Sequence, residues 1–573
     1  MCIASFLVAF SSPVNYHESD PKGSLLVSQA ILEYGSIKLD PYRDVLSAYS
    51  DRIVEFNHHL YYYFPPGTSL LSIPFVWLAN LFGWDMSDLD AIDQARLQNL
   101  ISALLVAISC LLVFLISRCF VSHSDSLLIT TAFIFGSSMM STMGSALWSH
   151  DFTTAIILLV VLVLISARQN KIRSLHPVVL GALLFLAYLS RPTSAIFIAL
   201  VLVYVFLESR KDFIQLMITL TIAGGFFMLL SWYEYGQLLP PYYLPSRLQN
   251  LVFLRALYGN LFSPARGLLV YSPFLLVTFI GLARIGGALR KEVFFWLGLS
   301  WLILHLIMIS QFPKWWGGYS FGSRLVTEAL PAGLLLTVIA FNRAHDVSYK
   351  IPSHILRLSF VALTLLAIGI NTVQGMYSPS TIRWNEVVEV DENPSYVFDW
   401  RFAQFMANPG MLASIPYDRA LSAPKPYQLG DEILPGSKKA VFVDWHKPAV
   451  EGGCRWSSSG SAQVLLKMKS DQVAAGSSFT LEMVMGETGD QSLSVEVNDI
   501  EVGEIPAGSG SNYSTHVFPL SREILAFEVA GSPEFLPVVI NFIPHTTPNL
   551  PKKSPGVSSL CRLKIYPNLQ DIP

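Results

Sequence analysis

Charged side chains are scarce in this sequence. Lys, Arg, Asp and Glu make up 14% of its 573 residues, whereas soluble proteins carry about 25%. Hydrophobic residues reach 52%, and the mean hydropathy is +0.46. This scarcity excludes an ordinary soluble protein and predicts an integral membrane protein. Because the net charge is only −3, the composition gives no reason to expect a nucleic-acid partner.

Apolar segments dominate the chain up to about residue 375. A helix of roughly 20 apolar residues is long enough to cross a bilayer. The first apolar segment is short for a span: 14 residues reach about 21 Å, less than the ~30 Å hydrocarbon core. It either begins upstream or lies shallow, and it has no basic region typical of a signal peptide. We expect about eleven spans, near residues 1–14, 97–117, 127–147, 152–167, 175–189, 193–207, 213–232, 266–283, 293–309, 325–341 and 357–373.

Basic residues in the short loops predict the orientation, because such residues favour the inner side of a membrane. An extra span over 69–84 would reverse the pattern, so we expect that segment to lie as a helix in the outer interface. Residues 15–96 then form a large outer loop with two or three surface helices. The basic loops expected inside are 168–173, 210–211, 284–291 and 343–357.

The C-terminal part has a different character. Residues 376–437 hold several prolines and predict an outer connector after the membrane domain of 1–375. From 438 to 573, short alternating apolar runs broken by Gly, Ser and Asn predict an antiparallel, jelly-roll-like β-sandwich. Cys454 and Cys561 lie near its two ends, in a compartment that permits disulfides. We expect them to be bridged, with two separate buried thiols as the alternative.

The outward loops carry the residues that suit chemistry. The first begins with Asn-Tyr-His-Glu-Ser-Asp-Pro-Lys-Gly at 15–23, which holds Asp20 and Lys22. A carboxylate at the bilayer surface is costly unless it stays hydrated or serves a site. Together, acids, cations and aromatic rings on one membrane face suit a phosphorylated sugar better than an ion pathway. The other outward loops contribute His150, Asp151, Arg191, Arg266, Lys314, Tyr319 and Arg324.

Each of these residues also has a structural interpretation. Asp20 can be a solvated acid, and His150-Asp151 can cap the span that follows. Any one basic residue can anchor the surface, and Trp315-Trp316 fits an aromatic belt. Four residues of the first loop could bind a metal, although their spacing matches no specific pattern: His17, Glu18, His58 and His59.

Taken in order, the motifs resemble the GT-C superfamily of membrane glycosyltransferases, especially bacterial members akin to protein mannosyltransferases and the aminoarabinose transferases of lipid A. The resemblance covers residues 1–375, and the tail resembles carbohydrate-associated sandwich domains more loosely. The first loop has Glu18-Ser19-Asp20 but no Asp-X-Asp, so metal dependence stays open. The motifs are Asp20-Pro21-Lys22-Gly23 followed by Leu39-Asp40, then Phe64-Pro65-Pro66-Gly67, His150-Asp151 and the Trp-Gly-Gly-Tyr-Ser-Phe-Gly-Ser-Arg segment ending at Arg324.

The resemblance implies an inverting transferase of the bacterial inner membrane, with its active site and β-domain on the periplasmic face. Its donor is a polyprenyl-phosphate sugar, its acceptor a hydroxyl of a lipid, glycan or protein. The attacking hydroxyl must lose its proton, so a positioned carboxylate is needed, and Asp20 is the candidate base. Fixed cations can stabilise the phosphate without a cofactor, although a divalent metal is compatible: Lys22, Arg191, Arg266, Lys314 or Arg324.

Two other functions fit parts of the sequence. A polysaccharide polymerase or ligase also acts on polyprenyl-linked sugars outside the membrane, but takes a diphosphate-linked oligosaccharide. A transporter or flippase of lipid-linked sugars is expected to place ionisable residues inside its spans. The predicted spans are almost free of such residues, which disfavours transport.

Overall fold

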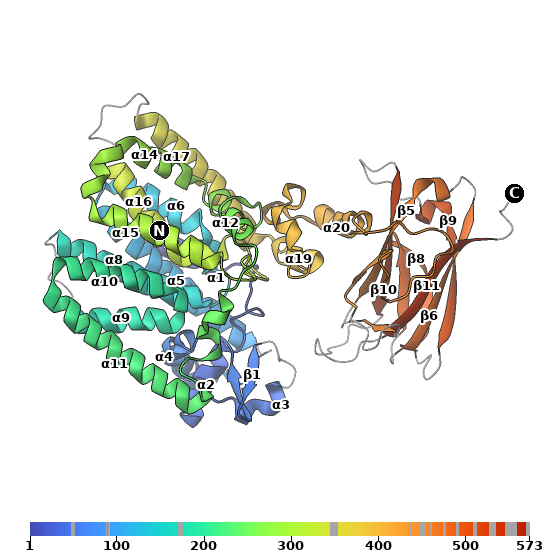
Figure 1. Cartoon of the computed structure of the whole chain (residues 1–573), viewed down its shortest axis with the longest axis horizontal. Coiled ribbons are helices and arrows are strands. Elements are labelled where there is room, and N and C mark those ends of the chain that lie inside the picture. The colour runs from blue at the N-terminus through green and yellow to red at the C-terminus, as the bar shows by residue number, and fades with distance from the viewer. Residues whose placement is uncertain are drawn as a thin grey trace. The chain divides into compact units, whose positions relative to one another are not determined.

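The computed structural model describes residues 1–46, 52–87, 89, 92–169, 176–343, 353–435, 437–445, 454–457, 461–473, 477–488, 492–507, 513–525, 534–544 and 558–568. The chain divides into two compact units, Met1–Pro409 and Gly410–Pro573. The first is helical and the second is built mainly from strands (Figure 1). The boundary falls inside the predicted connector of 376–437, so that segment is shared between the two units.

The first unit consists mostly of apolar helices. In the described part of the chain, five helical segments are long and apolar enough to cross a bilayer, judged by length and composition. They are α5 (Ile92–Arg118), α8 (Ser149–Arg168), α11 (Arg210–Tyr235), α16 (Leu330–Arg343) with the preceding 3-10 turn η6 (Arg324–Ala329), and His354–Tyr377, which includes most of α17 (Ser353–Ile368). Shorter apolar helices are α4 (Gly67–Leu81), α9 (Pro177–Ser190), α10 (Ala195–Glu208), α14 (Phe274–Ile285) and α15 (Val293–Ile309).

All of these helices except α4 fall on predicted spans, but the predicted number of eleven is not confirmed. The first predicted span is the nine-residue helix α1 (Cys2–Phe10), and the third is α6 (His123–Phe135). At ~1.5 Å per residue, neither reaches across a ~30 Å hydrocarbon core. Helix α6 ends at Phe135 instead of continuing to the predicted end of the span at residue 147. The Ser137 hydroxyl donates to the Phe133 carbonyl and accepts from the Met139 amide. Serine thereby competes with the helical ladder and caps the short α7 (Ser138–Ser141).

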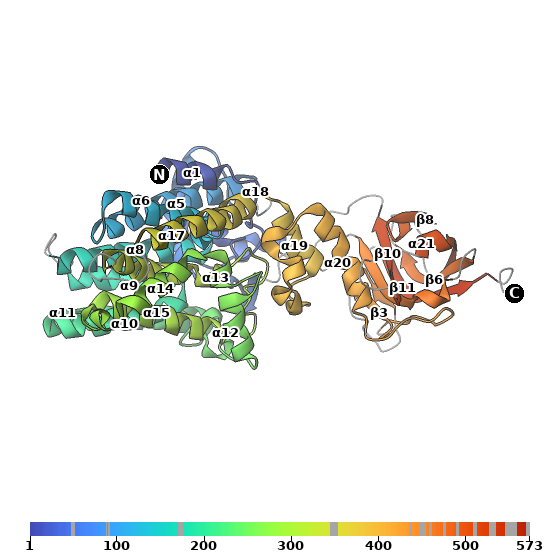
Figure 2. The same cartoon turned by 90° about the horizontal axis from the view of Figure 1, so that it is seen from above.

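Helix α11 lies at the edge of the helical unit, where it packs against α9 and α10 (Figures 1 and 2). Only 11% of its most apolar window is buried within the protein. An apolar helix this exposed would be unfavourable in water, because large apolar patches are rare on soluble proteins. Its surface therefore fits contact with lipid.

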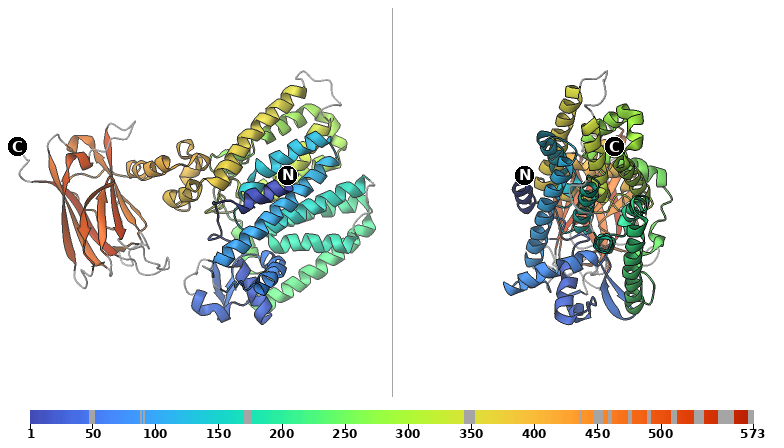
Figure 3. Two further views of the ribbon diagram at one scale, coloured as in Figure 1. Left: turned by 180° about the vertical axis from the view of Figure 1, so that it is seen from behind. Right: turned by 90° about the vertical axis from the view of Figure 1, so that its left-hand side faces the viewer.

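The large first loop folds into a small subdomain at one end of the helices (Figures 1 and 3). It contains α2 (Ser24–Tyr34), which packs against α4, and the single-turn α3 (Arg43–Leu46), in line with the expected two or three helices. The sequence did not predict the hairpin of β1 (Ile53–Phe56) and β2 (His59–Tyr62). Its tight turn places two residues at positive φ, Asn57 and His58, the conformation that two-residue hairpin turns require.

The second unit is the predicted antiparallel β-sandwich. One sheet has the strand order β3-β5-β10-β7-β8 and the other β4-β11-β6-β9, and apolar side chains from both sheets form one buried core. The strands are β3 (Ala440–Val443), β4 (Arg455–Trp456), β5 (Ala462–Lys469), β6 (Ser478–Thr488), β7 (Leu493–Val497), β8 (Ile500–Ile505), β9 (Ser514–Ser521), β10 (Phe535–Pro544) and β11 (Ser558–Pro567).

The expected disulfide is present in this unit. Cys454 immediately precedes β4, and Cys561 lies in β11, the strand that pairs with β4. Neighbouring strands bring the two α-carbons to 4.1 Å although the residues are 107 positions apart. The three other cysteines of the chain, Cys2, Cys110 and Cys119, are free.

Candidate functional site

Asp20 lies in the loop that leads into α2. Its carboxylate forms an ion pair with Arg324, and its backbone carbonyl accepts a hydrogen bond from the Tyr62 hydroxyl on β2. The Asp20 side chain is one-third exposed, whereas that of Arg324 is buried. The loop therefore presents a fixed, accessible carboxylate beside a cation that lies 304 residues further along the chain.

Arg324 connects three of the motifs that the sequence singled out. It opens η6, its guanidinium lies 3.8 Å from the centre of the Trp148 ring, and its Nη1 donates to the Gly317 carbonyl at 3.0 Å. A guanidinium over an indole face is held by cation–π attraction. The first loop, the Trp148 loop and the segment ending at Arg324 thus meet at one point.

A small pocket opens beside Asp20. The hydroxyls of Ser24 and Thr68 are buried there and have no hydrogen-bond partner among the described residues. Buried polar groups normally find partners, so these hydroxyls are available to a polar ligand. The pocket is lined by Asp20, Pro21, Ser24, Tyr62, Phe64, Pro65, Thr68, Leu147 and Ser149.

The Phe64-Pro65-Pro66-Gly67 motif also forms the contact between the first loop and α9. A Cβ atom at Gly67 would lie 2.3 Å from the backbone nitrogen of Ser190. Such a distance is impossible, so only glycine lets the two backbones approach this closely. The motif holds the pocket wall against the loop that contains Arg191.

Arg191 lies in a buried ion network instead of lining the pocket. Its Nε lies 3.1 Å from Oε2 of Glu328, and its Nη1 donates to Ser149 Oγ at 3.0 Å. Glu328 also accepts from Thr193 and lies 3.6 Å from His305 Nε2. Sequence reasoning missed Glu328 and His305, because both lie inside predicted apolar spans. An ionisable residue within such a span was the signal that could have identified them.

His150 and Asp151 are buried in the first turn of α8. Neither side chain makes a capping hydrogen bond in the part of the chain that the structure describes. Both ring nitrogens of His150 lack a hydrogen-bond partner in the described part of the chain. The Asp151 carboxylate faces the Ser102 hydroxyl on α5 without reaching hydrogen-bond geometry. Neither residue is among those that line the Asp20 pocket.

Arg266 points inward and holds the segment that precedes Arg324. Its guanidinium donates to the carbonyls of Trp316 at 2.6 Å and Gly318 at 3.2 Å, and to the amide oxygens of Asn385 and Gln404. The side chain is buried. A cation with this many protein acceptors is placed to fix the loop rather than to bind a ligand.

Lys314 and Tyr319 lie on the surface of the same segment. Lys314 is 65% exposed and pairs with Asp391, which also accepts from Trp316 Nε1 at 2.8 Å. Tyr319 is part exposed, and its carbonyl accepts from Ser19 Oγ at 3.3 Å.

The interpretation of Trp315-Trp316 as part of an aromatic belt is wrong, because both rings are buried. The Trp315 ring packs against Phe398.

Lys22 bonds within its own loop. Its Nζ lies 2.6 Å from Glu18, and His17 lies 3.1 Å from the same carboxylate. Burial by itself raises the pKa of Glu18, but the hydrogen bonds from His17 and Lys22 outweigh it and lower the pKa to about 2. Lys22 therefore shapes the turn that presents Asp20.

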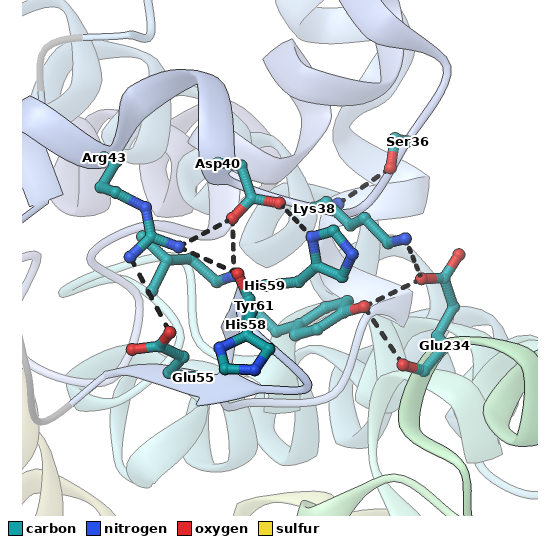
Figure 4. Close-up of polar contacts among 10 residues, drawn as sticks. Ser36, Lys38, Asp40, Arg43, Glu55, His58, His59, Tyr61 and Glu234 are labelled. Atoms are coloured by element: carbon teal, nitrogen blue, oxygen red, sulfur yellow. Dashed lines mark hydrogen bonds and ion pairs between the residues drawn. The ribbon is translucent and has the colours of Figure 1, made fainter.

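Asp40, the second acid of the first-loop motif, belongs to a separate cluster (Figure 4). Its carboxylate accepts from His59 at 2.6 Å, from Arg43 at 3.1 Å and from the Leu60 amide at 3.1 Å. Partial burial raises its pKa, and these hydrogen bonds outweigh that effect and lower it. Asp40 thus holds the hairpin to the rest of the loop.

The same cluster ties the loop to α11 (Figure 4). Glu234, near the end of α11, lies 3.5 Å from Lys38 Nζ and accepts from the Tyr61 hydroxyl at 3.0 Å.

No group of three or more metal-ligating side chains occurs among the residues that the structure describes. The four residues considered for a metal are divided, with His17 and Glu18 at the Asp20 turn and His59 beside Asp40.

No protein-family model and no curated protein matches the sequence. Among solved structures, it is similar to the oligosaccharyltransferase of Archaeoglobus fulgidus in its apo form, with 13% identity and a TM-score of 0.38. It is also similar to the oligosaccharyltransferase AglB of that organism in complex with an inhibitory peptide and a dolichol-phosphate, with 12% identity and a TM-score of 0.39. Each comparison covers 70% of this chain and 59% of the other. Likeness of this extent assigns neither family nor activity.

Proposed function

We propose that this protein is a membrane glycosyltransferase that moves a sugar from a polyprenyl-phosphate donor to an acceptor hydroxyl. The observation that carries this proposal is the pairing of Asp20 with Arg324 beside a pocket in which two buried hydroxyls have no hydrogen-bond partner among the described residues. A fixed carboxylate, a fixed cation and free hydrogen-bonding groups are what transfer of a sugar from a phosphate needs.

Asp20 acts as the general base. The acceptor hydroxyl gives its proton to the Asp20 carboxylate while its oxygen attacks the anomeric carbon. The bond from that carbon to the phosphate oxygen breaks on the opposite face, and its electron pair leaves with the phosphate. A single displacement of this kind inverts the configuration. The hydrogen bond from Tyr62 to the Asp20 carbonyl fixes the backbone that carries the base.

Arg324 stabilises the phosphate that leaves. Guanidinium groups bind phosphate oxygens through charge-assisted hydrogen bonds, and Trp148 and Gly317 hold this one in place. In the free protein Arg324 neutralises Asp20. When the anionic donor takes over the guanidinium, the carboxylate is released for the acceptor proton.

Donor chemistry tests this function directly. The purified full chain is incubated with a polyprenyl-monophosphate hexose and a mixture of saccharide, lipid and peptide acceptors, and release of polyprenyl monophosphate is measured. We expect release that depends on an acceptor. Turnover only with a diphosphate-linked oligosaccharide would favour a polymerase or ligase, and no turnover with either donor would contradict the proposal.

Orientation is part of the same proposal, in which the basic loops at 168–173, 210–211, 284–291 and 343–357 face the cytoplasm and Asp20 and the β-domain lie on the periplasmic face of a bacterial inner membrane. Cysteines replace Lys171, which lies outside the described residues, or Lys438, in a chain without the three free cysteines. We expect a membrane-impermeant maleimide to label position 438 in cells with a permeabilised outer membrane. Position 171 should react only after the inner membrane is opened. The reverse pattern would contradict the topology.

A further inference from the structure

Helix α12 (Phe253–Phe262) has an exposed apolar face. Leu254, Tyr258 and Phe262 recur at every fourth position, so they lie along one side of the helix. Their exposed fractions are 76%, 58% and 44%, and Leu251, just before the helix, is fully exposed. Soluble proteins rarely gather large apolar side chains into one exposed patch. We therefore expect an apolar partner to cover this face.

The opposite face of α12 packs against the end of α15, which is Ile309. Asn260 donates to the Ser310 hydroxyl at 3.1 Å. A Cβ atom at Gly259 would overlap the buried Trp315 ring, so glycine lets the helix rest directly on that ring. Helix α12 thus lies at the edge of the helical unit, where α15 ends (Figure 2).

The helix on which α12 packs is also apolar on its outer side. In α15, Trp296, Ile303, Leu304 and Ile307 are each at least 40% exposed. Such a surface fits lipid, as does that of α11, the long helix that precedes α12 in the chain. A bilayer that covers α15 to its end meets α12 next. The exposed face of α12 therefore continues the surface that faces lipid.

The charges near α12 suit a phospholipid surface. From residue 236 to 265 the chain has two basic residues, Arg247 and Arg255, and no acidic one. Arg255 is exposed on the helix itself, and basic side chains are attracted to anionic headgroups. Tyr258 adds an amphipathic ring of the kind enriched at membrane interfaces. This composition is typical of a helix that lies in the boundary between headgroups and acyl chains.

From these features we infer that α12 is an interfacial helix whose apolar face inserts into the phospholipid leaflet on the side of Asp20. The side follows from the segment that begins at Trp315, because this segment leads to Arg324, the partner of Asp20. Arg266, four residues after α12, donates to the Trp316 carbonyl of the same segment at 2.6 Å. Helix α12 thus anchors the loop that carries Arg324 at the level of the headgroups. If the proposed function holds, on which this last step rests, the donor phosphate lies at that level.

Spin labels measure the depth of α12 directly. Single cysteines replace Leu254 or Tyr258 in a full chain without the three free cysteines, reconstituted into nanodiscs of phosphatidylethanolamine and phosphatidylglycerol. Power saturation compares contact with oxygen, which enters lipid, and with a water-soluble nickel chelate. Two exposed positions serve as references, Ile222 in the middle of α11 for lipid and Tyr513 in the β-domain for water. We expect labels at 254 and 258 to favour oxygen and to lie about 5–10 Å into the boundary between headgroups and acyl chains.

Two outcomes would overturn the inference. Nickel contact as high as that at position 513 would place the face in water. Low contact with both reagents would mean that protein, either the β-domain or a second copy of the chain, covers α12. The measurement needs no turnover, so it is independent of the donor experiment. A chain that transfers sugar while its label at 254 lies in water would keep the proposed function and reject the membrane contact.

Discussion

Replacing Asp20 with Asn is expected to lower sugar transfer by about 10²–10⁴-fold, because the amide cannot accept the proton of the attacking hydroxyl. The substitution preserves the size of the side chain. It also keeps the hydrogen bond that the Tyr62 hydroxyl donates to the backbone carbonyl of residue 20. Release of polyprenyl monophosphate from a labelled donor gives the rate. The loss should fall on kcat, since the donor phosphate is bound by Arg324 rather than by Asp20.

Asp40 provides a matched control for this experiment. It is also an acid of the first loop, one-third exposed and paired with an arginine and a histidine, but it belongs to the cluster that holds the hairpin. Asp40→Asn should leave transfer within a few-fold of the wild type. Thermal unfolding of both variants checks that the Asp20 variant is folded. Near-normal turnover of folded Asp20→Asn would remove Asp20 from the mechanism.

The β-domain was predictable because alternation with a period of two is a strong local signal. The helical unit was predictable in position but less so in length. Hydropathy averages over a window, so it cannot see that the Ser137 hydroxyl ends α6 or that Pro273 delays the start of α14. The hairpin at Asn57-His58 was missed because its short strands lie between helices and carry several polar residues.

The candidate site was predictable only in outline. Position in predicted outward loops identified Asp20 and Arg324, but not that they pair, because the partners are 304 positions apart. Loop position also selected Arg266, whose inward direction depends on acceptors from residues 316–404. A sequence pattern gives the side of the membrane on which a residue lies, whereas packing decides whether its side chain faces a ligand or the protein.

Glu328 is where the structure predicts the largest loss of stability. Glu328→Gln removes the counter-ion of buried Arg191 and leaves its charge uncompensated, which typically costs about 3–5 kcal/mol. We expect a clear drop in the thermal unfolding temperature of the protein in detergent. The matched control is Glu292→Gln, which breaks a part-exposed pair with Arg343 and should cost less than about 1 kcal/mol.

The buried-charge explanation predicts more than instability. If the loss comes from the isolated Arg191 charge, then removing both charges in Arg191→Met/Glu328→Leu should recover much of it, because apolar pairs can replace buried ion pairs. If the loss came instead from the contacts of Glu328 with Thr193 and His305, the double variant would be no more stable than Glu328→Gln. A Glu328→Gln variant as stable as Glu292→Gln would show that the network does not hold the helices together.

Because Arg191 also donates to Ser149 in the wall of the Asp20 pocket, loss of the network should loosen that wall and raise the KM for the acceptor.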